Sequence, residues 1–226
     1  MSTNPNELTI ENSVVILIDH QPWVAFAVHS IDPALMINNV AALAQAARDL
    51  GVPVVLTTVG AKGSILADPL FTELSDLFPG VTPIDRTSTH AWSHPDVRAA
   101  VDKTGRKKLI MAGLVTEVCL CQSVLSALKD GFDVYFASDC SGGITPQGHE
   151  DAKARMIQAG ARPVSWEAVT SEWTPDYTAP EKQKLVDVYS KRGGASKLMF
   201  DYQMAQVTAG IAKAPSFVAQ PKKSSS

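Results

Sequence analysis

The chain lacks an excess of charge and long hydrophobic runs. Its 226 residues carry 20 Lys and Arg against 23 Asp and Glu, a formal net charge of −3. Nucleic-acid-binding proteins usually carry a basic patch, so this balance argues against a polyanionic partner. The longest apolar runs, such as residues 14–18, have the length of a strand and are far too short to span a bilayer. We therefore expect neither nucleic acid nor a membrane as a partner.

Cysteine is scarce as well. Only Cys119, Cys121 and Cys140 are present, and no CxxC pair occurs. Three cysteines cannot all pair within one chain, which favours free thiols in a reducing compartment. The first 13 residues contain neither the basic nor the apolar region of a secretory signal. These features predict a cytoplasmic protein.

Several cofactor signatures are also missing. The sequence contains no GxGxxG or GxxxxGKS/T motif for nucleotides and no GxSxG nucleophile elbow. Its five histidines form no HExxH motif and do not cluster with carboxylates in a metal-ligand pattern. We therefore expect no cofactor and no metal ion, which leaves chemistry carried by side chains alone.

What the sequence does contain is an alternation of apolar, β-branched segments with helical patterns. Residues 14–19 are too apolar for a half-exposed strand and predict a strand buried on both faces. Further strands are expected at residues 54–58, 82–85, 108–113, 134–138 and 162–165, and helices at 33–50, 70–78, 94–104, 116–130 and 147–159. Strands separated by helices of this length pair in parallel through right-handed crossovers. The prediction is an open three-layer α/β sheet with helices on both faces.

The sequence changes character near residue 175. We interpret residues 1–175 as one α/β domain and residues 176–226 as a helical extension. The extension holds helical patterns at about 179–191 and 196–212, which carry more apolar side chains than a free tail should expose. These helices pack either on their own core or on a neighbouring subunit, and we favour the subunit contact.

Reactive side chains follow four of the predicted strands. Open parallel sheets bind ligands beyond the carboxyl ends of their strands, near the point where the strand order reverses. Asp19, Arg86, Cys119 and Asp139 all lie at such ends. We expect Asp139 to cap the turn that follows it, which leaves the other three as candidates for a catalytic site.

Cys119 lies in the first turn of a helix that is predicted to begin at a Thr116 cap. The positive end of the helix dipole is expected to lower the pKa of its thiol, and free N–H groups at the same helix start could stabilise an oxyanion. The alternative is that Cys119 is a small buried hydrophobe, the usual role of an intracellular cysteine.

Asp19 and Arg86 are the candidates for a base and a fixed charge. Asp19 ends an apolar strand, where it acts either as a general base or as a cap for the following turn. Arg86 supplies positive charge but cannot shuttle protons, and its alternative is a surface ion pair with Asp85. The residues beside these positions either shape a substrate pocket or pack in the ordinary way; they are His20, Gln21, Trp23, His90, Trp92 and Thr116.

Three motifs together resemble the isochorismatase-like, or cysteine hydrolase, superfamily. They are VVILIDHQ, which ends at Gln21, GLVTEVC, which ends at Cys119, and GFDVYFASD, which ends at Asp139. They occur in the family's order and approximate spacing within about residues 10–175. The Asp-His-Gln sequence at 19–21 and the Ala-Trp pair that follows Arg86 look most like the YcaC-type branch of this superfamily.

The resemblance implies a six-stranded parallel sheet of order 3-2-1-4-5-6. It places Asp19 on the family's general base and Cys119 on its nucleophile. Leu114-Val115 matches the family's non-proline cis peptide, and the backbone N–H groups of Val115 and Cys119 match its oxyanion hole. Arg86 stands where the family commonly has lysine, which preserves the positive charge and removes proton transfer by that residue.

The metal-binding loop of nicotinamidases and the aryl-carrier domain of some isochorismatases have no counterpart in this sequence. Residues and resemblance together predict a cofactor-free hydrolase that cleaves an amide-like C–N bond of a small molecule through a thioester on Cys119. The resemblance also implies a homo-oligomer, with the octamer of that branch as its pattern. Two alternatives remain: a non-catalytic ligand-binding or scaffold protein on the same fold, and a redox-sensing thiol protein.

Overall fold

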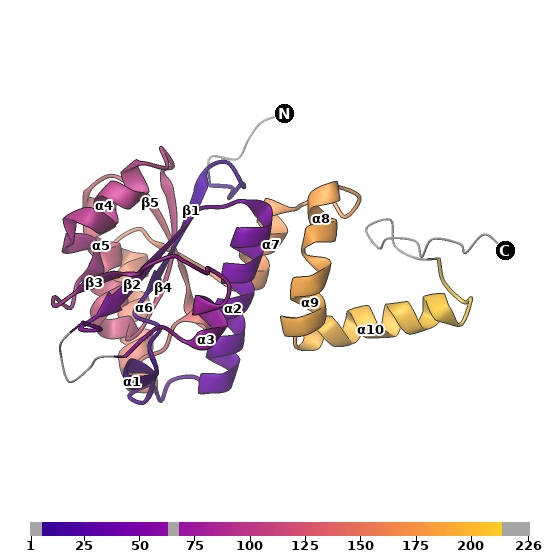
Figure 1. Cartoon of the computed structure of the whole chain (residues 1–226), viewed down its shortest axis with the longest axis horizontal. Helices are drawn as coiled ribbons and strands as arrows, with labels where there is room; N and C mark the ends of the chain where they lie inside the picture. The colour runs from indigo at the N-terminus through magenta and orange to yellow at the C-terminus, as the bar shows by residue number, and fades with distance from the viewer. Residues whose placement is uncertain (1–5, 63–67, 214–226) are drawn as a thin grey trace.

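The computed structural model describes residues 6–62 and 68–213. Its core is a sheet of six parallel strands in the order β3-β2-β1-β4-β5-β6, with helices on both faces (Figure 1). The strands are β1 (Ser13–Ile18), β2 (Val54–Val59), β3 (Ile84–Arg86), β4 (Lys108–Gly113), β5 (Asp133–Ala137) and β6 (Arg162–Val164). The predicted three-layer α/β architecture and strand order are confirmed.

Helices connect the strands and extend beyond them. They are α1 (Pro22–Ala25), α2 (Pro33–Leu50), α3 (Thr72–Ser75), α4 (Pro95–Asp102), α5 (Cys121–Lys129), α6 (Pro146–Gln158), α7 (Trp166–Trp173), α8 (Pro180–Lys184), α9 (Val186–Arg192) and α10 (Ala195–Thr208). Short helical turns are η1 (Ala91–Ser93), η2 (Thr116–Leu120) and η3 (Ser138–Cys140). Within residues 6–62 and 68–213, no helix is both long and apolar enough to cross a membrane.

Strand β1 lies at the centre of the sheet and is buried along its whole length. Because successive side chains of a strand point to opposite faces, β1 contributes to two separate cores. Val15 and Leu17 pack on the face covered by α2 and α7, whereas Ile16 and Ile18 pack on the face covered by α4, α5 and α6 (Figure 1). This double burial explains why the strand reads as one continuous apolar run.

Helix α2 begins and ends where its sequence predicts. The Asp32 side chain accepts a hydrogen bond of 2.8 Å from the N–H of Leu35, and Pro33 occupies the first turn. The helix ends at Gly51, whose φ of 74° lies in the left-handed region that glycine adopts without a steric penalty. These local signals fix both ends of the longest helix in the described part of the chain.

Several other elements differ from the prediction. The helix expected at 116–130 begins with the π-helical turn η2, and Val115 rather than Thr116 occupies the N-cap position. The helix expected at 70–78 is only the single turn α3, because Phe71 still has extended backbone and its N–H donates to the carbonyl of His20 (2.9 Å). The sequence pattern also does not predict α7, whose eight residues are too few for a clear periodic signal.

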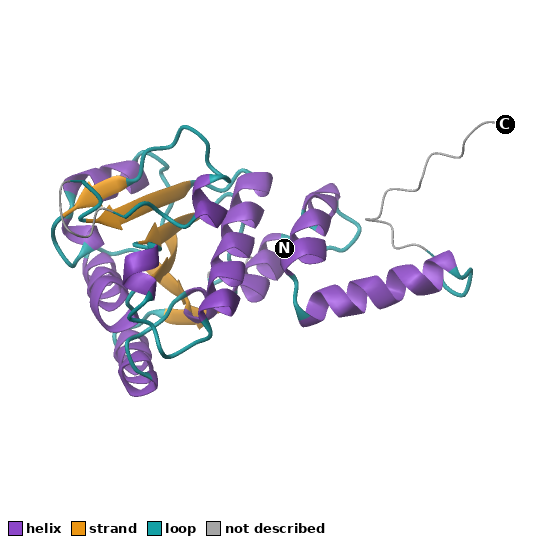
Figure 2. Cartoon of the chain, turned by 60° about the horizontal axis from the view of Figure 1, so that its bottom comes forward, coloured by secondary structure: helices purple, strands orange, loops and turns teal. Residues whose placement is uncertain are grey.

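The helices beyond Trp173 divide into two parts. Helix α9 packs on α2, where the Gln45 side chain donates to Asp187 (2.8 Å) and accepts from Arg192 (3.3 Å). Val188 of α9 joins the core on that face of the sheet. Helix α10 instead extends away from the body of the molecule, and none of its residues is buried (Figures 1 and 2).

Candidate active site

The fold brings Asp19, Arg86 and Cys119 together in one buried site. Asp19 follows β1, Arg86 ends β3, and Cys119 lies in η2 directly after β4, so all three lie at the carboxyl edge of the sheet. Strands β1 and β4 are the pair at which the strand order reverses, which is where such sheets bind ligands. Asp19 is fully buried, and Arg86 and Cys119 are only 4% and 7% exposed.

Arg86 clamps Asp19 with two parallel hydrogen bonds. Its Nη1 donates to Oδ1 at 2.6 Å and its Nη2 donates to Oδ2 at 2.5 Å, the bidentate geometry that makes such pairs strong. Burial alone would lower the pKa of Arg86, but the hydrogen bonds and charge of Asp19 outweigh it and raise the pKa. The alternative of a surface pair with Asp85 is wrong, since Asp85 instead accepts from the Thr58 hydroxyl at 2.8 Å.

Asp19 is further held by its own backbone and by Thr57. Its φ of 58° is left-handed, a conformation that few non-glycine residues adopt and that often marks a functional position. Its N–H donates to the carbonyl of Thr57 (3.2 Å), and the Thr57 hydroxyl donates to Asp19 Oδ1 (3.0 Å). Sequence analysis does not identify Thr57 as a site residue; the available signal is a threonine near the end of an apolar strand.

The Cys119 thiol is protonated at neutral pH. Burial, followed by the charge and hydrogen bond of Asp19, raises its pKa to about 12, while Arg86 and the Val115 N–H act in the opposite direction. The expectation that the helix start lowers this pKa is therefore wrong, because desolvation and a neighbouring carboxylate outweigh the dipole. A thiol in this state needs a base before it can act as a nucleophile, and the Asp19 carboxylate lies beside it.

The backbone before Cys119 contributes a hydrogen-bond donor. The Leu114-Val115 peptide is cis, as the family resemblance implies. The N–H of Val115 bonds to the Cys119 sulfur, so this donor lies beside the thiol. The next N–H, that of Thr116, is already used by the carbonyl of Gly142 at 2.9 Å.

Two of the pocket candidates hold loops together. His20 Nε2 donates to the carbonyl of Cys140 at 2.9 Å, and burial lowers the pKa of this ring to about 4, which keeps it neutral. Gln21 accepts from the N–H of Val59 and donates to the carbonyl of Asp68, both at 2.8 Å. Both side chains therefore fix the chain around the carboxyl end of β1.

Of the remaining pocket candidates, His90 and Trp92 connect the segment after β3 to α5 and its end, and Trp23 lies at the surface. His90 Nε2 pairs with the Ser126 hydroxyl at 2.8 Å. The indole of Trp92 is buried and donates to Asp130 at 2.8 Å, which places it in the core beneath α5. Trp23 is 52% exposed on α1. Burial, and to a lesser extent the charge of Arg86, lower the pKa of His90, so this ring lies near the site, whereas Trp92 belongs to the core and Trp23 to the surface.

Thr116 connects the start of η2 to α6. Its hydroxyl lies 2.9 Å from Nδ1 of His149, and both residues are buried. This contact explains why Thr116 does not cap the helix, because its side chain turns toward α6. Burial, reinforced by the charge of Lys153, lowers the pKa of His149. Sequence analysis does not mark His149, since nothing local identifies its distant partner.

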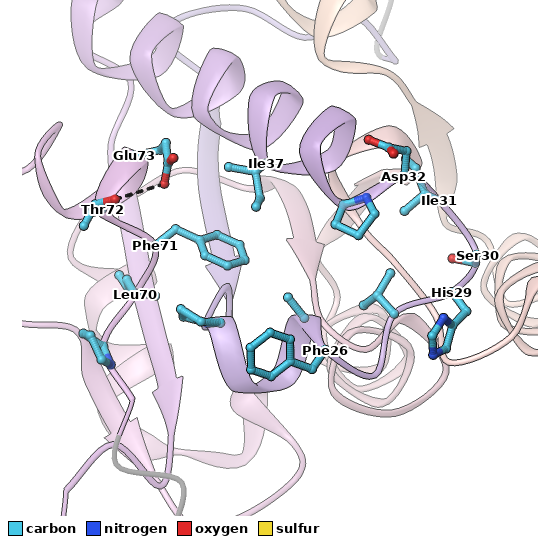
Figure 3. Close-up of a pocket in the computed structure, with 15 residues that line it drawn as sticks. Phe26, His29, Ser30, Ile31, Asp32, Ile37, Leu70, Phe71, Thr72 and Glu73 are labelled. Carbon is cyan, nitrogen blue, oxygen red and sulfur yellow. Dashed lines mark hydrogen bonds between the residues drawn. The ribbon is translucent and has the colours of Figure 1, made fainter.

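A cavity of about 900 Å³ lies beside the site, between α1, α2 and the segment that leads into α3 (Figure 3). Phe26, Ile37 and Phe71 are among its walls, whereas Asp19, Arg86 and Cys119 are not. The two regions meet at Phe71, whose ring packs edge-on against His20 with 6.4 Å between the ring centres. In the residues that the structure describes, no group of three or more His, Cys, Asp or Glu side chains is placed to hold a metal ion.

Comparison with known proteins identifies the family of this chain. Residues 13–168 match the family model of the isochorismatase domain. YcaC of Escherichia coli (strain K12), a probable hydrolase, is 38% identical over 167 residues, which cover 74% of this chain and 79% of that protein.

Two solved structures of YcaC have the same fold. The Escherichia coli protein, an octameric hydrolase of unknown specificity, matches with a TM-score of 0.82 and 34% identity over 90% of this chain and 100% of its own. YcaC from Pseudomonas aeruginosa, solved with hexane-2,5-diol and covalent acrylamide, gives a TM-score of 0.82 and 34% identity over 89% of this chain and 98% of its own. The chain therefore belongs to the isochorismatase family and resembles, along most of its length, hydrolases of that family.

Proposed function

We propose that this protein hydrolyses an amide-like C–N bond of a small molecule, with Cys119 as nucleophile and without a cofactor. The observation that carries the proposal is the contact between the Cys119 thiol and the Asp19 carboxylate inside a buried, arginine-clamped site. The raised pKa keeps the sulfur protonated until a substrate arrives. A thiol beside a carboxylate is the arrangement that general-base activation of a nucleophile requires.

The first half of the reaction forms a thioester. As the sulfur of Cys119 attacks the substrate carbonyl carbon, Asp19 takes the thiol proton and an S–C bond forms. The backbone N–H groups of Val115 and Cys119 stabilise the oxyanion of the tetrahedral intermediate. When this intermediate collapses, the C–N bond breaks and Asp19 transfers its proton to the leaving nitrogen, which departs as an amine or ammonia.

The second half releases the acid. Asp19 takes a proton from a water molecule that attacks the thioester, the S–C bond breaks, and the proton returns to the sulfur. Arg86 holds the carboxylate in place and keeps positive charge beside it, but it does not exchange protons. Every proton transfer of the cycle therefore falls on Asp19.

The relatives support a reactive nucleophile on this fold. YcaC from Escherichia coli is a hydrolase, and YcaC from Pseudomonas aeruginosa holds covalent acrylamide.

The redox-sensor alternative is weakened by the raised pKa of Cys119, because peroxides react with thiolates rather than with thiols.

Turnover of a panel of primary and secondary amides tests the proposal, with the released amine or ammonia as the readout. Cys119→Ala is expected to abolish turnover, and Cys121→Ala, which removes another buried thiol, is expected to retain it. Intact-mass analysis of quenched reactions should detect an acyl adduct that maps to Cys119. Comparable turnover in Cys119→Ala would rule out the covalent mechanism.

We also propose that the protein is cytoplasmic and assembles as a homo-oligomer, with residues 1–175 as the hydrolase domain and residues 176–226 as an extension that serves assembly. Three free, buried cysteines fit a reducing compartment. The exposed apolar residues of α10 and the octamer of Escherichia coli YcaC support the assembly.

A further inference from the structure

A second cavity lies within the helical extension, apart from the candidate active site. It measures about 270 Å³ and forms where α7, α8, α9 and α10 meet. Ser171 of α7, Lys182 of α8, Tyr189 of α9, and Met199 and Phe200 of α10 contribute to its walls. Neither the proposed hydrolysis nor the family comparison assigns a role to this cavity.

Lys182 is the unusual residue of this cavity. It is only 7% exposed, and its ammonium lies 4.7 Å from the ring centre of Tyr177 and 5.6 Å from that of Tyr189. Its Nζ donates to the Thr174 hydroxyl at 3.3 Å. Among the residues that the structure describes, no carboxylate oxygen lies within 4.0 Å of this ammonium.

The two tyrosine rings and the Thr174 hydroxyl compensate the positive charge of Lys182 only in part. A lysine ammonium has three donor hydrogens, and buried lysines are normally paired with an anion. Two aromatic faces attract the cation, but one long hydrogen bond leaves most of its donor capacity unused. The less buried lysines Lys153 and Lys191 do have carboxylate partners, at 2.8 Å in both cases, although water could solvate them instead. Lys182, which needs an anion more than these lysines do, is therefore left without a carboxylate partner among the residues that the structure describes.

We propose that the cavity binds a small organic monocarboxylate. Its carboxylate would pair with Lys182, and its apolar body would pack against Val186, Met199 and Phe200. Glu167 also lines the cavity and repels additional negative charge, which favours a single carboxylate over a phosphate. The volume suits a ligand of the size of an aromatic or short aliphatic acid.

Binding would connect α10 to the rest of the extension. The α10 residues that line the cavity are Ser196, Met199, Phe200 and Gln203, whose spacing places them on one face of the helix. Leu198 and Tyr202 lie on another face and are both 69% exposed. A ligand in the cavity would thus fix the orientation of α10 without covering its outward apolar residues.

The full-length protein with ¹³C-methyl-labelled methionine provides the test, with sodium benzoate as the probe. We expect benzoate to shift the Met199 methyl signal saturably and to raise the melting temperature, while Met111 in strand β4 remains unaffected. Benzyl alcohol, which has the same ring without the charge and without an amide bond, should bind at least about tenfold more weakly. Sodium phosphate at equal ionic strength should not reproduce the shift.

Two lysine variants separate the proposal from a general anion effect. Lys182→Met should lose benzoate binding at least about tenfold, whereas Lys184→Met, on the exposed side of the same helix, should bind as the unmodified protein does. If Lys182→Met does not fold, Phe200→Ala keeps the lysine, alters the apolar wall and should weaken benzoate binding. Equal binding in both lysine variants, no saturable Met199 shift, or the same shift with phosphate would overturn the proposal.

Discussion

Cys119 illustrates how the surroundings of a single residue override its position in the chain. A place in the first turn of a helix favours a thiolate, yet this sulfur is buried beside a carboxylate, and its pKa rises to about 12. The sulfur is therefore held as a thiol. In the proposed amide hydrolysis, attack at neutral pH depends on proton transfer to Asp19 rather than on a standing thiolate.

The pH dependence of Cys119 alkylation by iodoacetamide reports the pKa of this thiol. Because the pKa is raised, the thiolate fraction should increase about tenfold per pH unit throughout the range from pH 7 to 9, with no plateau. Asp19→Asn removes the charge that helps to raise the pKa, so it should accelerate alkylation at pH 8 while it abolishes amide turnover. Peptide mass spectrometry reports each cysteine separately. A plateau below pH 8 would contradict the raised pKa.

The Arg86–Asp19 pair makes a second residue-scale prediction, on stability. Arg86→Met leaves the fully buried Asp19 carboxylate without its partner and should lower the free energy of unfolding by about 3–5 kcal/mol. The control is Arg162→Met, since the pair of Arg162 with Asp133 spans 3.6 Å and is exposed, and its loss should cost less than about 1 kcal/mol. Urea unfolding measures both. Equal losses would mean that burial does not set the strength of this pair.

The sequence predicts best those helices and strands that are determined by residues within or next to them. Strand β1 and helix α2 follow from an apolar run, an Asp-Pro start and a glycine end. The candidate triad is also predictable, because parallel strands bring their carboxyl ends to one edge of the sheet. These features need no knowledge of distant contacts.

For the pocket candidates, the sequence does not predict the direction of the side chains. Proximity in sequence places His20, Gln21 and Trp92 beside the site, but their directions are set by partners far along the chain. The carbonyl of Cys140 orients His20, and the carboxylate of Asp130 orients Trp92. Such pairings depend on the packed fold, so a sequence pattern identifies the loop and not the direction of the side chain.

The contact between η2 and α6 provides an element-scale prediction. Thr116→Val keeps the side-chain shape but leaves a buried ring nitrogen of His149 without its partner, which should cost about 1–3 kcal/mol of stability. Thr72→Val, at an exposed position of α3, should change stability by less than about 0.5 kcal/mol. Combined with His149→Phe in a double-mutant cycle, Thr116→Val should have a smaller effect than alone. Additive effects would show that the two side chains are not coupled.

At the scale of the whole molecule, α10 is the feature that one chain does not explain. Its residues include Leu198, Met199 and Tyr202, which are between 69% and 74% exposed. A helix with apolar side chains on several faces is normally buried, so the exposure of these side chains favours an interface with another molecule. The match to Escherichia coli YcaC covers 90% of this chain, so it extends into the helices beyond Trp173. Part of the extension is therefore shared with a protein that is octameric.

We expect α10 to form part of the contact between copies, and charge on its outward face should break that contact. Leu198→Asp combined with Tyr202→Asp should convert the assembly to smaller species in native mass spectrometry and light scattering. Thr208→Asp places the same charge in the last turn of α10, away from those two side chains, and should leave the assembly intact. The sheet core does not include α10, so circular dichroism should remain that of a folded protein. A monomeric parent protein, or an unchanged assembly in the double variant, would remove α10 from the interface and leave its apolar surface to another partner.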